Sequence, residues 1–392
     1  MLLTNFEERI MQLRQVFGQD HIKDYFREMV EQDRIPHAML FLGTPGYGPL
    51  PMAAAFAQYL MCEDRQHGDS CGRCNHCHKS AKRIHPDIHY TFPTIGSKVT
   101  SADFGGDWRS FIEDNIYGEV FDWFTRIGGE NKQGNITKDE CQRILKVLSM
   151  KTFEGEFKVQ IIWMPEFLGK EGNRLLKMIE EPPPNTIFLL VAQHQEEILN
   201  TITSRCQLVA FKPLEDNVIE DFLVTNYPSA KAEVLKQIVF LAKGDINIAT
   251  DLAEEKEGFA ANIWLEWLRL AFKGHGVELV NWSDRFNRLD REAQKNFFRY
   301  GLHFFREMMM YMLDSKHEIL LMENENLAMR KLSNLSNVHA VQKAIALTND
   351  SIYHLERNAN SRILMMDCSI RLNKILHNKE AFDNKRMEKQ KA

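Results

Sequence analysis

Short runs of consecutive apolar residues recur in the first half of the chain, and turn-forming residues bound each of them. These runs cover residues 38–42, 159–163, 187–192 and 208–211. A run of this length is typical of a strand that is buried on both faces of a parallel sheet. The sequence therefore predicts at least four strands, and the glycine-rich turn after the first of them leads into a helix.

Apolar residues at helical spacing separate these runs. The helices that they predict cover residues 13–34, 53–57 and 174–181, and three prolines stop the last of them. Strands that alternate with helices form βαβ units. The pattern therefore predicts an α/β domain with a mainly parallel sheet.

The β signals fade after the fourth run, and the rest of the chain has the periodicity of helices. Helical patterns cover residues 217–226 and 232–243 and continue from about residue 254 onward. Phenylalanine and methionine recur at helical spacing in the last region, which favours a helix-bundle core. We expect an α/β domain over residues 1–211, a small helical domain over 212–254 and a larger helical domain over 255–392.

Residues 96–134 interrupt the α/β pattern and look like an insertion. The segment holds two glycine pairs, and its aromatic residues include Trp108, Phe111, Tyr117, Phe121, Trp123 and Phe124. We expect one or two small helices that pack on a neighbouring surface.

The composition is that of an ordinary globular protein, with 392 residues, 44% of them hydrophobic and 26% charged. The formal net charge of -5 argues against a free-standing basic protein that binds nucleic acid through its charge. No apolar run approaches the roughly 18 residues of a membrane span. Residues 1–9 include acidic side chains where a signal peptide would be basic. We therefore expect a cytoplasmic protein of two or three domains.

Four cysteines crowd into one short segment, residues 62–77. They are Cys62, Cys71, Cys74 and Cys77, spaced as C-x8-C-x2-C-x2-C. Four thiolates suit tetrahedral Zn²⁺ and leave no position for a reactive water, so the spacing predicts a structural zinc site. The alternative is a reactive dithiol, since C-x2-C also serves redox chemistry.

The glycine-rich turn after the first strand has the setting of a phosphate-binding loop but lacks its chemistry. Its residues include Gly43, Gly46 and Gly48, followed by Pro49 and Leu50. A working loop of the form G-x-x-x-x-G-K-[ST] has a lysine and a hydroxyl at these last two positions. The acidic pair expected at the end of the second predicted strand is likewise replaced, by Trp163 and Met164. We expect no ATP hydrolysis, and binding of nucleotide without hydrolysis stays open.

Ser204 and Arg205 follow a short helical segment after the third apolar run. An arginine at such a position can lie at a subunit face and reach the γ-phosphate of a neighbour's nucleotide. Taken alone, it can equally be an arginine in a surface ion pair.

An ordered series of motifs between residues 16 and 211 resembles the AAA+ clamp-loader subunits of bacterial DNA polymerase III. It consists of His37–Phe41, the Gly43–Gly48 loop, the four cysteines, His85-Pro86-Asp87, Phe153-Glu154-Gly155, Asn173–Lys177 with Glu180–Pro183, and Ser204-Arg205-Cys206. The segment Lys243–Ala249 fits the lid domain of that family. The resemblance implies an AAA+ parallel-sheet domain with a zinc module, a helical lid domain and a C-terminal helical collar that holds the subunits together.

The resemblance also implies a role in loading the sliding clamp onto primed DNA during replication. The partners would be ATPase subunits and a delta subunit in a hetero-pentameric ring, with the clamp and primer-template DNA contacted through the assembly. This chain would be the stator, a subunit that does not hydrolyse ATP. Arg205, within its serine-arginine-cysteine motif, would be an arginine finger supplied in trans to the ATP of the adjacent subunit.

Three other interpretations stay open at this point. One is a weak ATPase that uses an unconventional lysine, such as Lys170 or Lys177. Another is a free-standing zinc-dependent nucleic-acid binder, against which the acidic net charge counts. The third is an AAA+-derived scaffold subunit of some other complex, because a fold does not fix a function.

Overall fold

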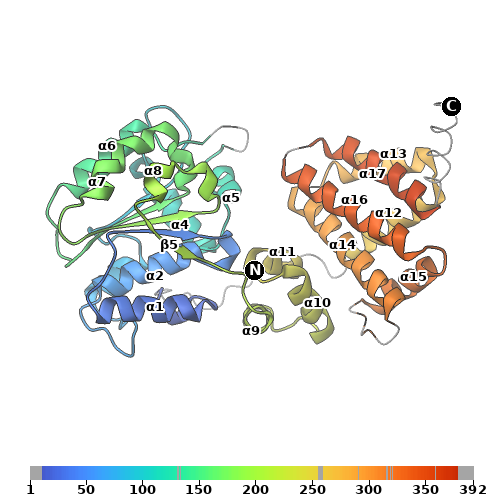
Figure 1. Ribbon diagram of the computed structural model, residues 1–392, viewed down its shortest axis with the longest axis horizontal. Coiled ribbons are helices and arrows are strands. Elements are labelled where there is room, and N and C mark those ends of the chain that lie inside the picture. Colours follow the sequence, from blue (N-terminus) through green and yellow to red (C-terminus); the bar gives the residue numbers. More distant parts are fainter. Residues whose placement is uncertain are drawn as a thin grey trace. The chain divides into compact units, whose positions relative to one another are not determined.

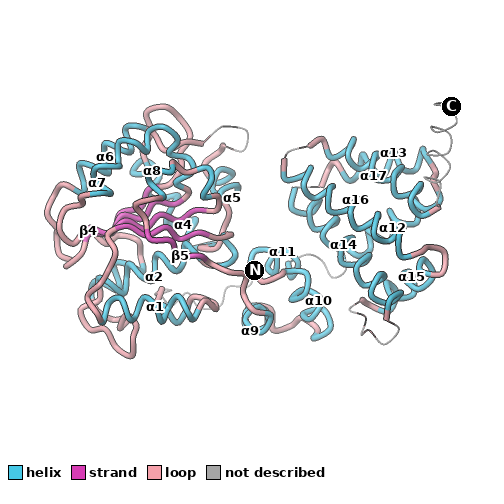
Figure 2. The backbone as a smooth tube through the Cα atoms, in the orientation of Figure 1, coloured by secondary structure: helices cyan, strands magenta, loops and turns pink. Residues whose placement is uncertain are grey.

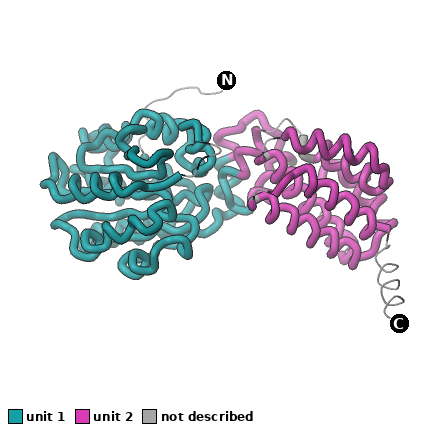
Figure 3. Tube along the Cα trace, turned by 90° about the horizontal axis from the view of Figure 1, so that it is seen from above, with its two compact units in different colours: residues 1–222, 243–247 teal, residues 223–242, 248–392 magenta. Residues whose placement is uncertain are grey.

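The computed structural model describes residues 11–129, 132, 134–254, 259–289, 291–314, 317, 319, 321–357 and 359–377. The acidic segment over residues 1–9 lies outside these. The chain divides into two compact units (Figure 3). One comprises residues 1–222 with 243–247, and the other comprises residues 223–242 with 248–392. The expected division into three domains stays a prediction.

The first unit is built on one five-stranded sheet, drawn in magenta in Figure 2. Its strands are β1 (Ala38–Leu42), β2 (Ile88–Thr91), β3 (Lys158–Trp163), β4 (Thr186–Ala192) and β5 (Gln207–Ala210). Their order in the sheet is β2-β3-β4-β1-β5, and every pairing is parallel. The four strands that the apolar runs predict are all present, and the predicted α/β fold with a parallel sheet is confirmed.

The sequence pattern missed the fifth strand, β2, because it is not a continuous apolar run. Ile88 and Thr91 are buried, whereas His89 and Tyr90 between them are only partly buried. The strand pairs with β3 alone and forms one edge of the sheet. An edge strand needs less apolar surface than a central one, so this element lacks the signal that identified the others.

Helices cover both faces of the sheet (Figure 1). The aromatic rings of Phe26 and Phe56, on α1 (Asp20–Glu31) and α2 (Pro49–Met61), pack on one face near Phe41. The other face is covered by a cluster that includes Ile144, Ile179 and Ile202. These come from α6 (Lys138–Leu148), α7 (Leu176–Glu180) and α8 (Asn200–Thr203). The unit also contains η1 (Leu13–Gln15), η2 (Pro45–Tyr47), α3 (Asn75–Ala81), η4 (Pro165–Leu175) and η5 (Gln195–Glu197).

The single helix predicted over residues 13–34 is wrong, because the chain turns between η1 and α1. Gly18 and Gln19 both have positive φ, at 58° and 57°. A Cβ on Gly18 would also lie 2.8 Å from the side chain of Leu214. Both the left-handed backbone and the close approach favour glycine here, and they end the first helical turn.

The insertion folds as the two small helices that its sequence predicts, α4 (Gly105–Asn115) and α5 (Val120–Arg126), after the turn η3 (Ser101–Phe104). Its aromatic side chains pack against the chain's own sheet domain. Trp108 and Trp123 are buried. Trp108 stacks on Phe92, with ring centroids 4.2 Å apart, and Trp123 meets the same ring edge-on at 4.9 Å. Most of the aromatic side chains of the insertion therefore belong to the core.

The second unit is helical, in agreement with the sequence pattern. Its core contains Trp264, Trp267, Trp282, Phe297 and Met308, so the aromatic and methionine residues are packing residues, as expected. The helices that follow β5 are α9 (Asp216–Asn226), α10 (Ala232–Ala242), α11 (Ile246–Glu254), α12 (Phe259–Lys273), α13 (Gly276–Phe286), α14 (Arg291–Leu313), α15 (Glu323–Ser333), α16 (Val338–Glu356) and α17 (Ser361–Leu376). Within the described part of the chain, none of the helices has the length and apolar character needed to cross a membrane.

Candidate functional site

The four clustered cysteines come together in space. The sulfur atoms of Cys62, Cys71, Cys74 and Cys77 all lie within 4.8 Å of one another, and those of Cys71 and Cys77 are 4.0 Å apart. Four sulfurs at Zn–S distances of about 2.3 Å would be separated by about 3.8 Å, so only a small contraction is needed. Gly72 has a φ of 74°, which lets the backbone turn tightly between the ligands.

Backbone N–H groups stabilise the thiolate form of one cysteine of this cluster, which favours binding of a cation. The N–H groups of Arg73 and Cys74 point at the sulfur of Cys71, at 3.5 and 3.4 Å. Although burial opposes ionisation, these donors lower the pKa of Cys71 to about 7. Burial raises the pKa of Cys62 and Cys77, so those thiols would ionise only beside a positive charge. The donor set therefore fits a thiophilic metal ion.

The segment between the first two cysteines is fastened to the first unit by hydrogen bonds. The carboxylate of Asp69 accepts the backbone N–H groups of Leu13 and Arg14, at 3.0 and 2.9 Å. Arg27 on α1 donates to the carbonyl oxygen of Gly68 at 2.9 Å. The cysteine cluster thus braces η1, α1 and the end of α2.

A second group of metal-capable side chains, His76, His85 and Glu154, lies next to the cysteines. Its hydrogen bonds already account for the two imidazoles. The backbone N–H of Asp87 donates to Nδ1 of His85 at 3.1 Å, which places the ring hydrogen on Nε2, 2.7 Å from Nδ1 of His76. Burial lowers the pKa of His85 to about 4, so the ring is neutral at pH 7. A metal on Nε2 would have to displace that hydrogen, so the group acts as a hydrogen-bonded chain.

Asp87 explains why the sequence contains both His85-Pro86-Asp87 and Phe153-Glu154-Gly155. Its carboxylate accepts the backbone N–H groups of Phe153, Glu154 and Gly155, at 2.7, 2.9 and 2.8 Å. Although burial opposes ionisation, these three donors hold the pKa of Asp87 below its usual value. The motif therefore fixes the loop before β3 and has a structural role.

The glycine-rich loop after β1 folds as the 3₁₀ turn η2. The N–H groups of Tyr47 and Gly48 donate to the carbonyl oxygens of Thr44 and Pro45, both at 3.0 Å. Backbone donors that would face a phosphate in a working loop are therefore used within the turn.

The residues on either side of this turn also offer few backbone N–H groups to a phosphate. The N–H of Gly43 donates to the carbonyl oxygen of Ala192 on β4, at 3.0 Å. Pro49 and Pro51 have no N–H, and Leu50 between them is buried at the start of α2. The loop keeps the strand–turn–helix position of a phosphate-binding loop. Most of the backbone N–H groups that would bind a phosphate are either hydrogen-bonded within the chain or replaced by proline.

Tyr117, at the end of the insertion's first helix, packs against this loop. A Cβ on Gly48 would lie 3.3 Å from its ring. Its hydroxyl accepts the N–H of Phe17 at 3.2 Å, and the side-chain amide of Asn247 donates to its carbonyl oxygen at 2.7 Å. These contacts hold a buried aromatic ring over the glycine that precedes α2.

A buried carboxylate lies against the middle of the loop. A Cβ on Gly46 would overlap Oδ1 of Asp245, so only glycine allows this approach. The same oxygen accepts the N–H of Asn247 at 2.8 Å. Together with burial, the charge of Asp245 raises the pKa of Tyr47. A phosphate at this position would meet a like charge in a poorly solvated place.

The two residues that replace the acidic pair at the end of β3 are part of the apolar core. Trp163 packs on Trp108 and Phe111 of the insertion, with ring centroids 5.1 and 5.7 Å apart. Met164 has a φ of 57°, and its N–H donates to the carbonyl oxygen of Val191 at 2.8 Å. Neither position offers an oxygen side chain for Mg²⁺.

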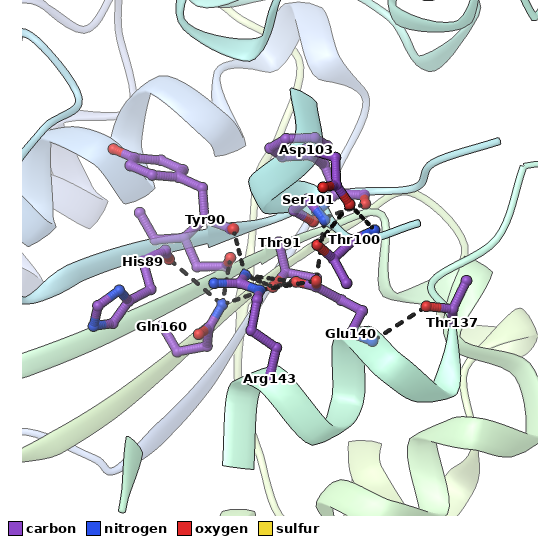
Figure 4. Close-up of polar contacts among 12 residues, drawn as sticks. His89, Tyr90, Thr91, Thr100, Ser101, Asp103, Thr137, Glu140, Arg143 and Gln160 are labelled. Atoms are coloured by element: carbon purple, nitrogen blue, oxygen red, sulfur yellow. Dashed lines mark hydrogen bonds and ion pairs between the residues drawn. The ribbon is translucent and has the colours of Figure 1, made fainter. Parts of the chain in front are cut away.

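Figure 4 shows a buried polar network that attaches the start of the insertion to the sheet. Glu140 on α6 accepts hydrogen bonds from the hydroxyl of Thr91, the N–H of Ser101 and the guanidinium of Arg143. Although burial opposes ionisation, Arg143 and Thr91 hold the pKa of Glu140 below its usual value. Sequence reasoning did not find this network, because its partners lie about 40 to 50 positions apart.

Ser204 and Arg205 lie directly after α8, and the Arg205 side chain is 34% exposed. Its Nε donates to Oε2 of Glu180 at 3.2 Å, and its Nη1 donates to the carbonyl oxygen of Thr201 at 2.9 Å. The hydroxyl of Ser204 also donates to Thr201, at 3.4 Å. The ion pair that the sequence allowed is therefore present, and it leaves the guanidinium partly open to solvent.

The sequence is similar to subunits of bacterial DNA polymerase III. The family described as "DNA polymerase III, delta subunit" matches residues 18–215. The delta-prime subunit of DNA polymerase III from Bacillus subtilis is 28% identical over 196 residues, which are 50% of this chain and 48% of that protein. The Haemophilus influenzae delta-prime subunit is 26% identical over 259 residues, 63% of this chain and 68% of that protein.

A gamma subunit of DNA polymerase III from Buchnera aphidicola is also similar, at 26% identity over 248 residues, 62% of this chain and 57% of that protein. The chain thus spans between about half and two thirds of the length of these curated relatives. With the matched residues covering the whole parallel sheet, the chain belongs to the DNA polymerase III delta-subunit family and is a homologue of the delta-prime subunit of the bacterial clamp loader.

Proposed function

We propose that this chain is the stator of a DNA sliding-clamp loader, a subunit that hydrolyses no ATP and supplies Arg205 in trans to a neighbouring ATPase subunit. The observation that supports the proposal is a contrast between two places in the first unit. Side chains of the same chain fill the space around the phosphate loop, whereas the guanidinium of Arg205 is partly exposed to solvent. The partners would be ATPase subunits and a delta subunit in a hetero-pentameric ring. The sliding clamp and primer-template DNA would be contacted through the assembly.

The closed loop supports the absence of hydrolysis by this chain. Tyr117 covers Gly48, the carboxylate of Asp245 abuts Gly46, and Trp163 fills the end of β3. A nucleotide would have to displace a buried ring and approach a buried carboxylate, with no lysine or Mg²⁺ ligand to compensate. The same contacts argue against binding of nucleotide without hydrolysis.

The position of Arg205 supports a role in trans. Arg205 follows the short helix α8, which comes after the C-terminal end of β4 in the chain. The N–H groups of its guanidinium that are not bonded within the chain can donate to another molecule. A guanidinium that meets the γ-phosphate of a neighbour stabilises the charge that develops in the transition state. Ser204, whose hydroxyl hydrogen-bonds to Thr201, would fix the turn that presents Arg205.

We also propose that the cysteine cluster holds one structural Zn²⁺. Its four sulfurs would complete the tetrahedral shell, so the ion would brace the fold without taking part in chemistry. The role in replication would place the protein in the cytoplasm.

The proposal is tested by affinity purification of the tagged chain from its native cells, with identification of the proteins that accompany it. ATPases with intact phosphate loops and a sliding clamp should co-purify. An unrelated set of proteins would replace the replication role with that of a scaffold in another complex. ATP turnover by the purified chain alone would instead support the weak-ATPase interpretation, with Lys170 and Lys177 as the lysines to substitute.

A further inference from the structure

The side chain of Arg205 is held by two elements that are separate in the sequence. Its Nε donates to Oε2 of Glu180 at 3.2 Å, and Nη2 lies 3.2 Å from the same oxygen. On the other side, Nη1 donates to the carbonyl oxygen of Thr201 on α8, at 2.9 Å. The inner edge of the guanidinium is therefore bound within the chain, while the remaining Nη1 and Nη2 hydrogens are available to a partner.

The place of Glu180 in its helix makes this contact specific. Glu180 is the last residue of α7, and the prolines that follow Glu181 prevent the helix from continuing. A carboxylate at the C-terminal end of a helix is disfavoured by the helix dipole unless a cation lies beside it. Arg205 is that cation, so the end of α7 and the turn after α8 are coupled through one ion pair.

We infer that Glu180 is a positioning residue, which orients Arg205 so that its outer N–H groups face the nucleotide of the neighbouring subunit. This inference rests on the proposed function. Glu180 is 56% exposed, so its ion pair with Arg205 contributes little to the stability of the fold. The effect of the pair is instead to limit the rotamers of the long Arg205 side chain. An arginine that is already oriented loses less freedom when it binds a phosphate.

The test uses the assembled complex, reconstituted from this chain and the ATPase subunits that co-purify with it, with ATP and primed DNA as the probes. Glu180→Ala should lower kcat for ATP hydrolysis by about two- to tenfold and leave KM for ATP within about twofold, because only the ordering of one side chain is lost. Glu180→Gln retains an acceptor oxygen for Nε and should give an intermediate kcat. Glu181→Ala is the matched control, since the side chain of this exposed neighbour has no hydrogen-bond or ion-pair partner among the described residues, and its backbone N–H bond to Lys177 is unaffected by the substitution.

The variant Arg205→Ala separates the two proposals. If Arg205→Ala lowers kcat and Glu180→Ala adds no further loss in that background, the glutamate acts through the arginine. If Arg205→Ala lowers kcat but Glu180→Ala alone behaves as wild type or raises kcat, Glu180 does not position the finger and only this inference fails. If Arg205→Ala has no effect on kcat, the proposed function in trans fails first.

Discussion

Two edges of the first unit hold features that ATPase subunits use, and they differ in how much of each is exposed. The closed edge is the glycine-rich loop over Gly43–Gly48, and the open edge is the turn that holds Ser204 and Arg205. At the glycine-rich loop, Tyr117 and Asp245 of the same chain occupy the space beside Gly48 and Gly46. At the turn after α8, Arg205 keeps part of its guanidinium in solvent. At the closed edge, most backbone N–H donors of the loop are used within the chain. At the open edge, the guanidinium keeps N–H donors that another molecule can bind.

Under the proposed function, a subunit that hydrolyses no ATP still serves a catalytic assembly. A loop without a nucleotide can be packed as core, and the insertion contributes aromatic side chains to that packing. An arginine finger acts on a partner's nucleotide, so it needs exposure and orientation but no nucleotide of its own. Four predictions test how the first unit is held together and which contacts keep the loop closed.

The largest effect should come from the metal. Zinc binding contributes on the order of 10 kcal/mol in small zinc domains, so Cys74→Ser should abolish metal binding and loosen the packing around η1 and α1. Elemental analysis should find about one zinc per chain in the wild-type protein and none in the variant. Metal-free protein with an unchanged melting temperature would contradict a structural role for the site.

The insertion should be the next most sensitive part of the closed edge. Trp108→Ala removes a ring that packs on Phe92 and Trp163, and it should lower the free energy of unfolding by about 3–5 kcal/mol. Phe121→Ala, in the same insertion but 52% exposed, is the matched control and should cost little. Denaturant unfolding measures both, and equal stability of the two variants would mean that the insertion is not core.

His89 on β2 should make the stability of the chain depend on pH. Burial, with the charge of Arg143, lowers the pKa of His89 from 6.5 to about 4, so the unfolded state binds the proton more readily than the folded state between these values. Stability should therefore fall as the pH decreases from about 6.5 to 4, by about 3 kcal/mol in total from this group. His89→Phe should flatten that part of the profile, and a profile that keeps its slope would assign the effect to other groups.

The smallest effect should follow from restoring the loop motif. Pro49→Lys with Leu50→Thr recreates the sequence of a phosphate-binding loop, yet Tyr117 and Asp245 would still occupy its surroundings. We expect no ATP binding by the purified double variant in an equilibrium titration with a fluorescent nucleotide. Micromolar binding would show that the missing side chains, rather than the packing, keep nucleotide away.

Much of this architecture could be predicted from the sequence, because the central strands are continuous apolar runs and the cysteine spacing is local. The edge strand β2 escaped because His89 and Tyr90 interrupt its apolar character. The helix over residues 13–34 failed because apolar periodicity continues across Gly18, where the backbone takes a positive φ. Sequence periodicity reports burial and carries little information on such a turn.

The contacts that define the two edges could not be predicted in the same way. Tyr117 lies 69 positions after Gly48, and Glu180 lies 25 positions before Arg205. The aromatic richness of the insertion indicated packing, but only the fold identifies the phosphate loop and the end of β3 as the surfaces that it covers. Likewise, the sequence placed Arg205 after a helix and left both an ion pair and a role in trans possible.

The role of Arg205 in trans is tested most directly by the rate of ATP hydrolysis of the reconstituted assembly, stimulated by primed DNA, when this chain alone carries Arg205→Ala. We expect a ring that assembles normally and a kcat that falls several-fold, because one neighbouring ATP site loses the charge that stabilises its transition state. An assembly with unchanged kcat would mean that Arg205 is only half of a surface ion pair, and that the open edge does not serve a partner's nucleotide.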